Sequence, residues 1–247
     1  MSSKLIRPRH WLARLKFYVD VNWVKTLYFN FRMFPFEVAL KLPVYFYGSV
    51  KFASLKGSIS ISGPLSAGMV GFGQTYELLS RSKGTALLHL DGSLQFNGKA
   101  QFGKDYTIFV GPGAVCRLGD MAGMGNSGKL ICHELIQFGQ YVRIGYESQV
   151  LDSHFHQMVD TATNTKLPMT SPVFLGSYNY LGHRVTIMPG SATPDRCTVA
   201  SNSMCNKDYR HLGTNILIGG IPAKLLKNNI SRDWEGEEEA MEQWLRV

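Results

Sequence analysis

Two histidines and an aspartate stand close together near the middle of this chain. They are Asp152, His154 and His156, at the start of a polar stretch that reads LDSHFHQMVDTATNTKLPMTSP. An imidazole with an ordinary pKa of about 6.5 can remove a proton from an attacking hydroxyl near neutral pH. If the backbone here is strand-like, the three side chains point to one face, where Asp152 can orient a histidine ring. The stretch therefore predicts general-base chemistry in a loop.

The residues on either side of the stretch repeat with a period of six. The count fails at Asp120 and Asn126, and after the polar stretch it resumes one residue out of phase. Glycine follows several of the repeating residues, as in Phe102-Gly103 and Phe138-Gly139. The members of the series are Leu90, Phe96, Phe102, Ile108, Ala114, Cys132, Phe138, Ile144, Val150, Leu175, Leu181, Ile187, Thr193, Val199 and Cys205.

A period of six differs from both common secondary-structure periods. Alternating strands repeat every two residues and helices every 3.6, so a period of six indicates short straight runs joined by regular corners. One aliphatic residue per run points inward, and backbone hydrogen bonds join each coil to the next at about 4.8 Å. The sequence therefore predicts an all-β stack of coils. The polar stretch is too long for a corner, so we expect it to project as a loop, where rigid scaffolds commonly carry their chemistry.

Two motifs give this stack a family resemblance. The segment VTIMPGSATPDRCTVASNSMCNKDY, followed by NILIGGIPAKLLK, resembles the terminal coils of hexapeptide-repeat acyltransferases, and its residues 220–224 resemble their G-x-P-A-K signature. Residues 152–156 resemble the D-x-D-F-H motif of the family, in which the final histidine is catalytic. The resemblance extends over roughly residues 60–232, and the branch most resembled modifies sugars in polysaccharide biosynthesis.

The resemblance implies a left-handed parallel β-helix, an exception to the usual right-handed crossover. We expect a basic, aromatic-rich helical segment at 1–56 and the β-helix at 57–218. The excursion loop is expected at 152–171, and a C-terminal tail and helix at 219–247. Members of the family are generally homotrimers with active sites between neighbouring prisms, so the resemblance also implies a homotrimer.

The resemblance also assigns roles to particular residues. It implies an O-acetyltransferase that moves an acetyl group from acetyl-CoA directly to a hydroxyl of a sugar or glycan, with no metal. His156 is the expected general base, Asp152 the orienting residue and His154 the fallback base. The expected coenzyme A-binding residues lie on the terminal coils, where the lysines would meet phosphates as point charges. They are Ser201, Lys207, Lys224 and Lys227.

This chain departs from the family motif at two positions. His154 stands where Asp or Asn is common, and Gln157 follows where Pro or an aromatic residue is usual. These departures leave the acceptor open, so N-acylation of an amino sugar stands beside O-acylation, and acyl groups other than acetyl stand beside acetyl.

The N-terminal segment carries most of the net charge. The chain has a formal charge of +8, and residues 1–60 hold ten Lys or Arg against Asp20 and Glu37, so the rest of the chain is balanced. Residues 4–47 mix these basic residues with many aromatic ones, and we expect two short helices there. One interpretation is a cap that packs its aromatic side chains on the body. The other is that residues 1–47 contact an anionic membrane. No recognition motif supports nucleic-acid binding.

Composition places the chain among ordinary globular proteins. Of its 247 residues, 45% are hydrophobic, and its four cysteines have no disulfide or zinc spacing, so we expect them reduced and mostly buried. The N-terminus lacks the apolar stretch of a signal peptide, which predicts a cytoplasmic protein, possibly at the inner face of the membrane. Residues 233–247 read as a short acidic helix, expected to pack on the basic N-terminal segment.

Two other functions fit parts of the pattern. Carbonic anhydrases on the same scaffold bind zinc through three histidines, and His154, His156 and His183 could supply such a set. Alternatively, the stack could be a scaffold that binds a partner without catalysis.

Overall fold

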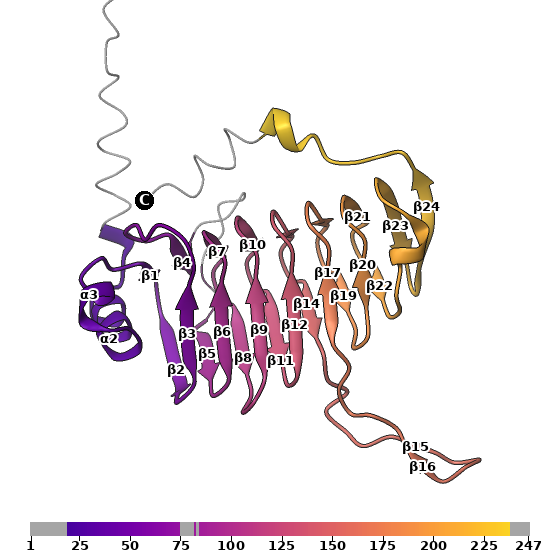
Figure 1. The fold of residues 1–247 in the computed structure, drawn as a ribbon, viewed down its shortest axis with the longest axis horizontal. Helices are drawn as coiled ribbons and strands as arrows, with labels where there is room; N and C mark the ends of the chain where they lie inside the picture. The colour runs from indigo at the N-terminus through magenta and orange to yellow at the C-terminus, as the bar shows by residue number, and fades with distance from the viewer. Residues whose placement is uncertain (1–18, 75–81, 83, 238–247) are drawn as a thin grey trace, which may run out of the picture.

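The chain forms a three-sided prism of stacked coils, closed at one end by helices (Figure 1). The computed structural model describes residues 19–74, 82 and 84–237. Each coil contributes one short strand to each side, so each side is a parallel sheet whose neighbouring strands come from successive coils. The 3.6-residue pattern of a helix occurs only at the N-terminal end and in one turn near residue 234.

Three sheets make the three sides of the prism. The nine-stranded sheet runs β1 (Val44–Phe46), β4 (Val70–Phe72), β7 (Ala100–Phe102), β10 (Ala122–Met124), β13 (Arg143–Ile144), β18 (Tyr180–Leu181), β21 (Cys197–Val199), β23 (Ile216–Gly220) and β24 (Ala223–Asn228). The seven-stranded sheet runs β2 (Val50–Leu55), β5 (Ala86–Leu90), β8 (Thr107–Val110), β11 (Lys129–Cys132), β14 (Gln149–Leu151), β19 (Thr186–Ile187) and β22 (Met204–Cys205). The six-stranded sheet runs β3 (Ser58–Ile61), β6 (Ser93–Phe96), β9 (Val115–Leu118), β12 (Leu135–Phe138), β17 (Val173–Leu175) and β20 (Ala192–Thr193).

The residues of the period-six series all point into the prism. Each of them is buried, with no more than 4% of its surface exposed. The series fails at Asp120 and Asn126 because the coils there are longer than 18 residues. Ala100 pairs with Ala122, a coil of 22 residues, whereas Tyr180 pairs with Thr198, a coil of 18. Extra corner residues therefore shift the phase without disturbing the inward face.

Glycine is needed where two corners touch. A Cβ atom on Gly139 would lie 2.5 Å from the backbone nitrogen of Ser177 in the next coil. A Cβ atom on Gly145 would lie 2.7 Å from the carbonyl oxygen of Gly182. Real Cβ atoms do not approach backbone atoms this closely, so these glycines let consecutive coils keep their hydrogen-bonding distance. This explains why glycine follows the inward residue at these positions.

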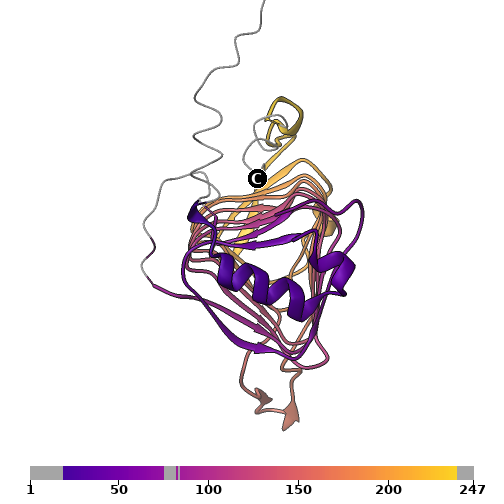
Figure 2. The same ribbon diagram turned by 90° about the vertical axis from the view of Figure 1, so that its left-hand side faces the viewer.

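Helix α2 (Trp23–Met33) lies across the N-terminal end of the prism, followed by the short helix α3 (Phe36–Ala39) (Figures 1 and 2). The buried side of α2 carries two polar side chains that bond to the first strand. The amide of Asn30 donates to the Val44 carbonyl at 2.7 Å and accepts from the Val44 N–H at 3.2 Å. The hydroxyl of Thr26 accepts from the Phe46 N–H at 3.0 Å. Helix α2 therefore satisfies the edge of the nine-stranded sheet, which would otherwise be open.

The β-helix begins earlier than the predicted boundary at residue 57. Strands β1 and β2 already pair in parallel with β4 and β5, so the first coil starts at Val44. The sequence pattern missed this coil because large aromatic rings replace its small repeating residues. Phe46 packs against Phe29 of α2 at 4.9 Å and stacks on Phe72 of the next coil at 5.1 Å. The first coil thus serves both as a coil and as the floor under the helical cap.

The predicted boundary at residue 218 is also misplaced, because it falls inside β23. Strand β24 extends the same sheet by antiparallel pairing with β23, so the stack ends at Asn228. The chain then returns along the prism as residues 229–237, with one helical turn from Trp234 (Figure 1).

Trp234 is 3% exposed and packs on Met121, Tyr141, Tyr178 and Tyr180. The prediction that the acidic helix packs on the N-terminal segment is wrong for residues 234–237, because these tyrosines at successive corners offer an aromatic surface to Trp234. The rest of the predicted helix and residues 1–18 lie outside the described residues.

The four cysteines are free and buried, as predicted. Burial raises the pKa of Cys197 and of Cys205 to about 12, so both thiols are protonated near neutral pH. In the part of the chain that the structure describes, no helix has the length and apolar character needed to cross a bilayer.

Candidate active site

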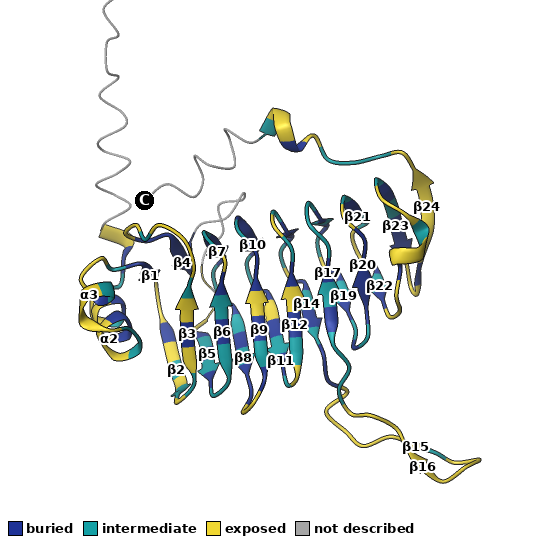
Figure 3. Ribbon diagram, viewed as in Figure 1, coloured by how far each residue is buried: buried dark blue, intermediate teal, exposed yellow. Residues whose placement is uncertain are grey.

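The polar stretch of the sequence forms an arm that leaves the prism between β14 and β17 (Figure 1). Arg143 pairs with Tyr180, 37 residues later, whereas a regular coil takes 18 residues, so the arm adds 19 residues to one corner. Its base is fixed by backbone hydrogen bonds from His154 N–H to the Met169 carbonyl and from Ser171 N–H to the Asp152 carbonyl. Its far end is a short hairpin of β15 (Val159–Asp160) and β16 (Thr165–Lys166). Most of the arm is exposed (Figure 3).

Asp152 is fully buried at the base of the arm, and its carboxylate bonds to the backbone of the coil below. One oxygen accepts from the His133 N–H at 2.7 Å, and the other accepts from the N–H groups of Glu134 and Leu135 at 2.8 Å each. The Cys132 thiol lies 3.5 Å from the second oxygen. These donors hold the corner at residues 132–135, where the arm interrupts the regular backbone ladder. The carboxylate therefore faces the corner and not a histidine ring.

The corner also influences the neighbouring thiol. Contact with Cys116, burial and the nearby Asp152 carboxylate all raise the pKa of Cys132 above its ordinary value. The Cys132 thiol therefore stays neutral and packs as a small core side chain.

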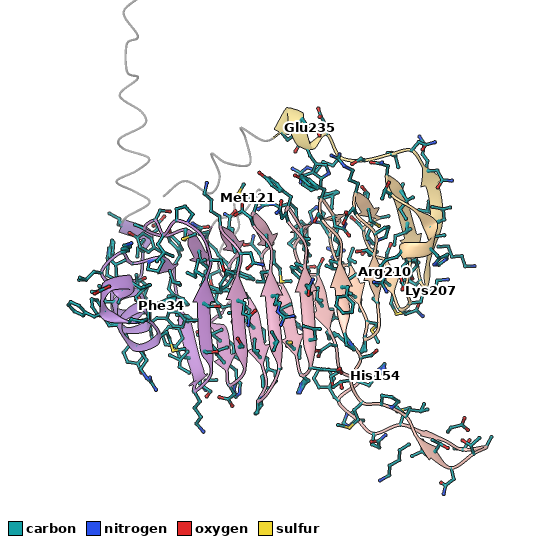
Figure 4. All side chains as sticks on the ribbon, viewed as in Figure 1. Phe34, Met121, His154, Lys207, Arg210 and Glu235 are labelled. Atoms are coloured by element: carbon teal, nitrogen blue, oxygen red, sulfur yellow. The ribbon has the colours of Figure 1, made fainter. Side chains whose placement is uncertain are left out.

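His154 and His156 both lie in the exposed part of the arm, close to its base. Figure 4 labels His154 where the arm leaves the body of the prism. The predicted strand that would place both rings on one face is absent, since residues 154–156 form a bend and Phe155 has a φ of +63°. A left-handed residue between the two histidines breaks the alternation of a strand. The two imidazoles are therefore near each other in sequence but do not share a strand face.

Phe155 connects the base of the arm to a column of rings on the prism. Its ring meets His133 edge-on at 5.6 Å, His133 lies 4.8 Å from Phe109, and Phe109 stacks on His89 at 4.5 Å. The four rings come from successive coils along the seven-stranded side. At about 4.8 Å per coil, the column covers about 14 Å between His89 and the arm.

The column ends at a polar cluster that the sequence analysis did not single out. His89 Nε2 lies 2.9 Å from Asp91 Oδ2, and the Ser54 hydroxyl donates to the other oxygen of Asp91. The bond from Ser54, aided by His89, lowers the pKa of Asp91 below its ordinary value, so this carboxylate is ionised near neutral pH. The side chains of His89 and Asp91 are 26% and 19% exposed. An imidazole held by a carboxylate is suited to accept a proton, which makes His89 a second candidate base.

A sequence signal for this cluster exists. His89 and Asp91 are two residues apart at the end of a run with strand character, a spacing that places both on one side. It was missed because the period-six series draws attention to Leu90 between them.

The predicted coenzyme-binding residues all lie on the last coils. Lys224 and Lys227 are exposed on β24, paired with Gly219 and Leu217 of β23. Lys207 is exposed with its ammonium 5.6 Å from the Tyr209 ring, and Ser201 is exposed at a corner, where its hydroxyl accepts from the His183 N–H at 3.0 Å.

Arg210, which the sequence analysis did not select, is also exposed on this end of the prism, next to Lys207 (Figure 4). Its guanidinium makes a bidentate pair with Asp208, with Nη2 2.7 Å from Oδ2, so part of its charge is already compensated. The C-terminal end of the prism therefore presents several exposed cations.

The histidines of the zinc hypothesis do not form a ligand set. His183 stacks on Tyr146 at a corner, with ring centroids 3.8 Å apart, whereas His154 and His156 lie on the arm. Among the described residues, no group of three His, Cys, Asp or Glu side chains is placed to hold a metal ion.

Comparisons with known proteins rest on structure. No protein-family model matches the chain, and no curated protein matches it by sequence. Among solved structures, the polySia-specific acetyltransferase NeuO covers 79% of this chain and 79% of its own, with 15% identity and a TM-score of 0.55. The chain has the left-handed parallel β-helix fold of the hexapeptide-repeat acyltransferases.

Two further solved structures resemble this fold less well. The polysialic acid O-acetyltransferase OatWY is 18% identical over 74% of this chain and 86% of its own, with a TM-score of 0.41. AntD, an N-acyltransferase from Bacillus cereus in complex with dTDP and 3-hydroxybutyryl-CoA, is 16% identical over 85% and 95%, with a TM-score of 0.45. Only the superposition on NeuO is close enough to bear on the fold.

The contacts of Asp152 predict a structural role that can be measured. In Asp152→Asn, one carboxylate oxygen becomes an NH₂ group that faces backbone N–H donors, so buried donors lose their acceptor. We expect the free energy of unfolding to fall by about 3 kcal/mol, measured by urea denaturation.

Asp195→Asn is the matched control, since Asp195 is exposed and accepts one hydrogen bond, from the Ser177 N–H. Its loss is expected to stay below about 1 kcal/mol. If Asp152→Asn were as stable as the unchanged protein but inactive, the carboxylate would belong to the reaction instead.

Proposed function

We propose that this protein is an acyltransferase that moves an acetyl group from acetyl-CoA to a hydroxyl of a sugar or glycan. The single observation that carries the proposal is the position of the histidine-bearing arm, which projects from one corner of an acyltransferase-type β-helix. An amino group of an amino sugar is the alternative acceptor. NeuO acetylates polysialic acid according to its name, whereas AntD is an N-acyltransferase, so this fold supports both chemistries.

His156 is the proposed general base. It would remove the proton of the acceptor hydroxyl as the oxygen attacks the thioester carbonyl, and coenzyme A would leave as the tetrahedral intermediate collapses. Transfer is direct, so no group on the protein becomes acylated. Since the Asp152 carboxylate is occupied by backbone donors, its proposed contribution is to fix the base of the arm on which His156 sits.

The acyl donor is proposed to lie with its phosphates near the cations of the last coils. Lys207, Lys224 and Lys227 are exposed there, and Ser201 offers a hydroxyl at a neighbouring corner. Lysine serves as a point charge for phosphate, and none of these three lysines has an ion pair among the described residues.

The protein is further proposed to act as a homotrimer. The arm carries five exposed hydrophobic side chains, and it extends well beyond the prism with only a two-residue strand pair at its tip (Figure 3). They are Phe155, Met158, Val159, Leu167 and Met169. A short hairpin without a core is marginally stable in water, so contact with a neighbouring copy would stabilise the arm and bring His156 to a shared site.

Binding of the donor can be measured without knowledge of the acceptor. We expect titration calorimetry with acetyl-CoA to show about one site per chain, and Lys224→Ala/Lys227→Ala to weaken binding by about tenfold or more as phosphate contacts are lost. The matched control is Lys51→Ala/Lys56→Ala, two exposed lysines at the opposite end of the prism, which should leave binding unchanged. Absence of binding by both acetyl-CoA and free coenzyme A would remove the basis of the proposal.

The base can be identified by turnover with a glycan acceptor found by screening. His156→Ala should lower kcat by about 10²–10⁴ with acetyl-CoA affinity unchanged, because only proton transfer is lost. His154→Ala, on the same arm, and His89→Ala, in the cluster with Asp91, are the matched variants and should retain most activity. A larger loss in either variant than in His156→Ala would assign the base to that residue.

The trimer predicts a concentration-dependent mass. Sedimentation equilibrium should give a particle of three chains, and Met158→Ser/Leu167→Ser should shift it toward the monomer by removing apolar contact from the arm. A monomer in the unchanged protein, or a trimer insensitive to these substitutions and to truncation of residues 158–167, would contradict this assembly through the arm.

A further inference from the structure

Helix α2 has hydrophobic side chains on its solvent face as well as on its buried face. Val24, Leu27, Tyr28 and Phe31 are 77%, 43%, 55% and 45% exposed. Their spacing of three, four and seven residues places them in one line along the helix. Phe36 and Leu40, at 67% and 59% exposure, extend this line across α3. We call these six residues the apolar stripe.

The buried face of α2 does not explain the stripe. That face is formed by Thr26, Phe29 and Asn30, which bond to or pack on the first coil. A helix that only closed the stack would present polar residues to water on its other side. The stripe instead places large apolar groups in solvent, and contiguous exposed apolar surface of this kind marks a contact site.

The position of the stripe limits what can cover it. Helix α2 lies across the end of the prism, so its outer face looks along the stack and away from the three lateral sides (Figure 2). A neighbouring chain that contacts a lateral side or the arm would leave this end free. The helix therefore lies flat at the extreme end of the molecule, as an interfacial helix lies in the plane of a membrane.

Charge around the stripe favours an anionic surface. Arg32 and Lys41 are exposed within it, and the Lys25 ammonium lies 4.9 Å from the Phe52 ring at its edge. The sequence that precedes α2 adds five basic residues and no acidic one in residues 1–18, against Asp20 and Glu37 near the stripe. Basic residues next to exposed aromatic and aliphatic ones match an anionic lipid headgroup layer over acyl chains.

We propose that the N-terminal end of the prism docks on a membrane containing anionic lipid, with the apolar stripe inserted at the headgroup boundary. This inference does not depend on the proposed acyl transfer. It stands the stack upright on the membrane, and β14, from which the arm departs, is the fifth strand of its sheet from that end. At about 4.8 Å per strand, the base of the arm lies about 20 Å above the surface.

Flotation of the full-length protein with lipid vesicles tests the docking. The protein should float with phosphatidylcholine vesicles that contain phosphatidylglycerol and remain behind with phosphatidylcholine alone. High salt should weaken binding, because the basic residues act through screened charges. Equal binding to both vesicles, or no binding to either, would overturn the proposal.

The stripe is tested by Val24→Asn/Leu27→Gln/Phe31→Gln, which removes apolar surface from the outer face only. Vesicle affinity should fall roughly a hundredfold, since interfacial binding scales with the apolar area inserted. Ile221→Gln/Leu226→Gln is the matched control, because Ile221 and Leu226 are equally exposed at the opposite end of the prism. It should float like the unchanged protein.

Two readouts keep the stripe experiment interpretable. Circular dichroism and thermal melting should match the unchanged protein, since none of the substituted residues is buried. If the stripe variant instead floats normally, or if it dissociates an assembly that sediments intact in the unchanged protein, the stripe covers another copy of this chain and the membrane assignment is overturned.

Discussion

The structure depends on one constraint: every coil must lie directly on the one before it, in register, so that parallel backbone hydrogen bonds join them. A coil has no core of its own and is stable only with neighbours above and below. This requires an apolar residue inside each side and no Cβ where corners touch, as at Gly139 and Gly145. Residues can be added only at corners, where they project outward. Both the longer early coils and the arm are additions of this kind.

The two interruptions of the stack are closed by buried polar side chains. At the N-terminal end, Asn30 and Thr26 from α2 occupy the hydrogen-bonding positions that a preceding coil would fill. At the arm, Asp152 accepts the N–H groups of three consecutive residues where the ladder is broken. In each case an uncompensated backbone group would be costly, so the element that interrupts the stack also supplies the bonds. The sites of potential function thus coincide with the places where the backbone needs side-chain partners.

These dependencies explain what the sequence could predict. The parallel stack and the arm were predictable because period-six repetition is a local pattern, and Leu175, Leu181 and Ile187 show it without interruption. The first coil was not, since Phe46 and Phe52 replace its small repeating residues with rings that serve the cap. The role of Asp152 was also misjudged, because its partners at residues 133–135 belong to the preceding coil and sequence spacing does not reveal them. The His89–Asp91 pair with Ser54 required the same cross-coil information.

The separation of features along the stack has a functional consequence. The apolar stripe, the arm and the exposed lysines of the last coils lie at the N-terminal end, the middle and the C-terminal end of one rigid prism. Because successive coils are hydrogen-bonded throughout, their spacing cannot change by bending at a hinge. An acceptor held at a membrane would have to extend about four coil steps, or about 20 Å, to meet an imidazole on the arm. A single sugar next to a lipid headgroup is too short for that distance, whereas a chain of several sugars can reach it. The rigidity of the prism therefore favours an oligosaccharide or polymer over a monosaccharide as the acceptor, if the stripe and the arm act on the same molecule.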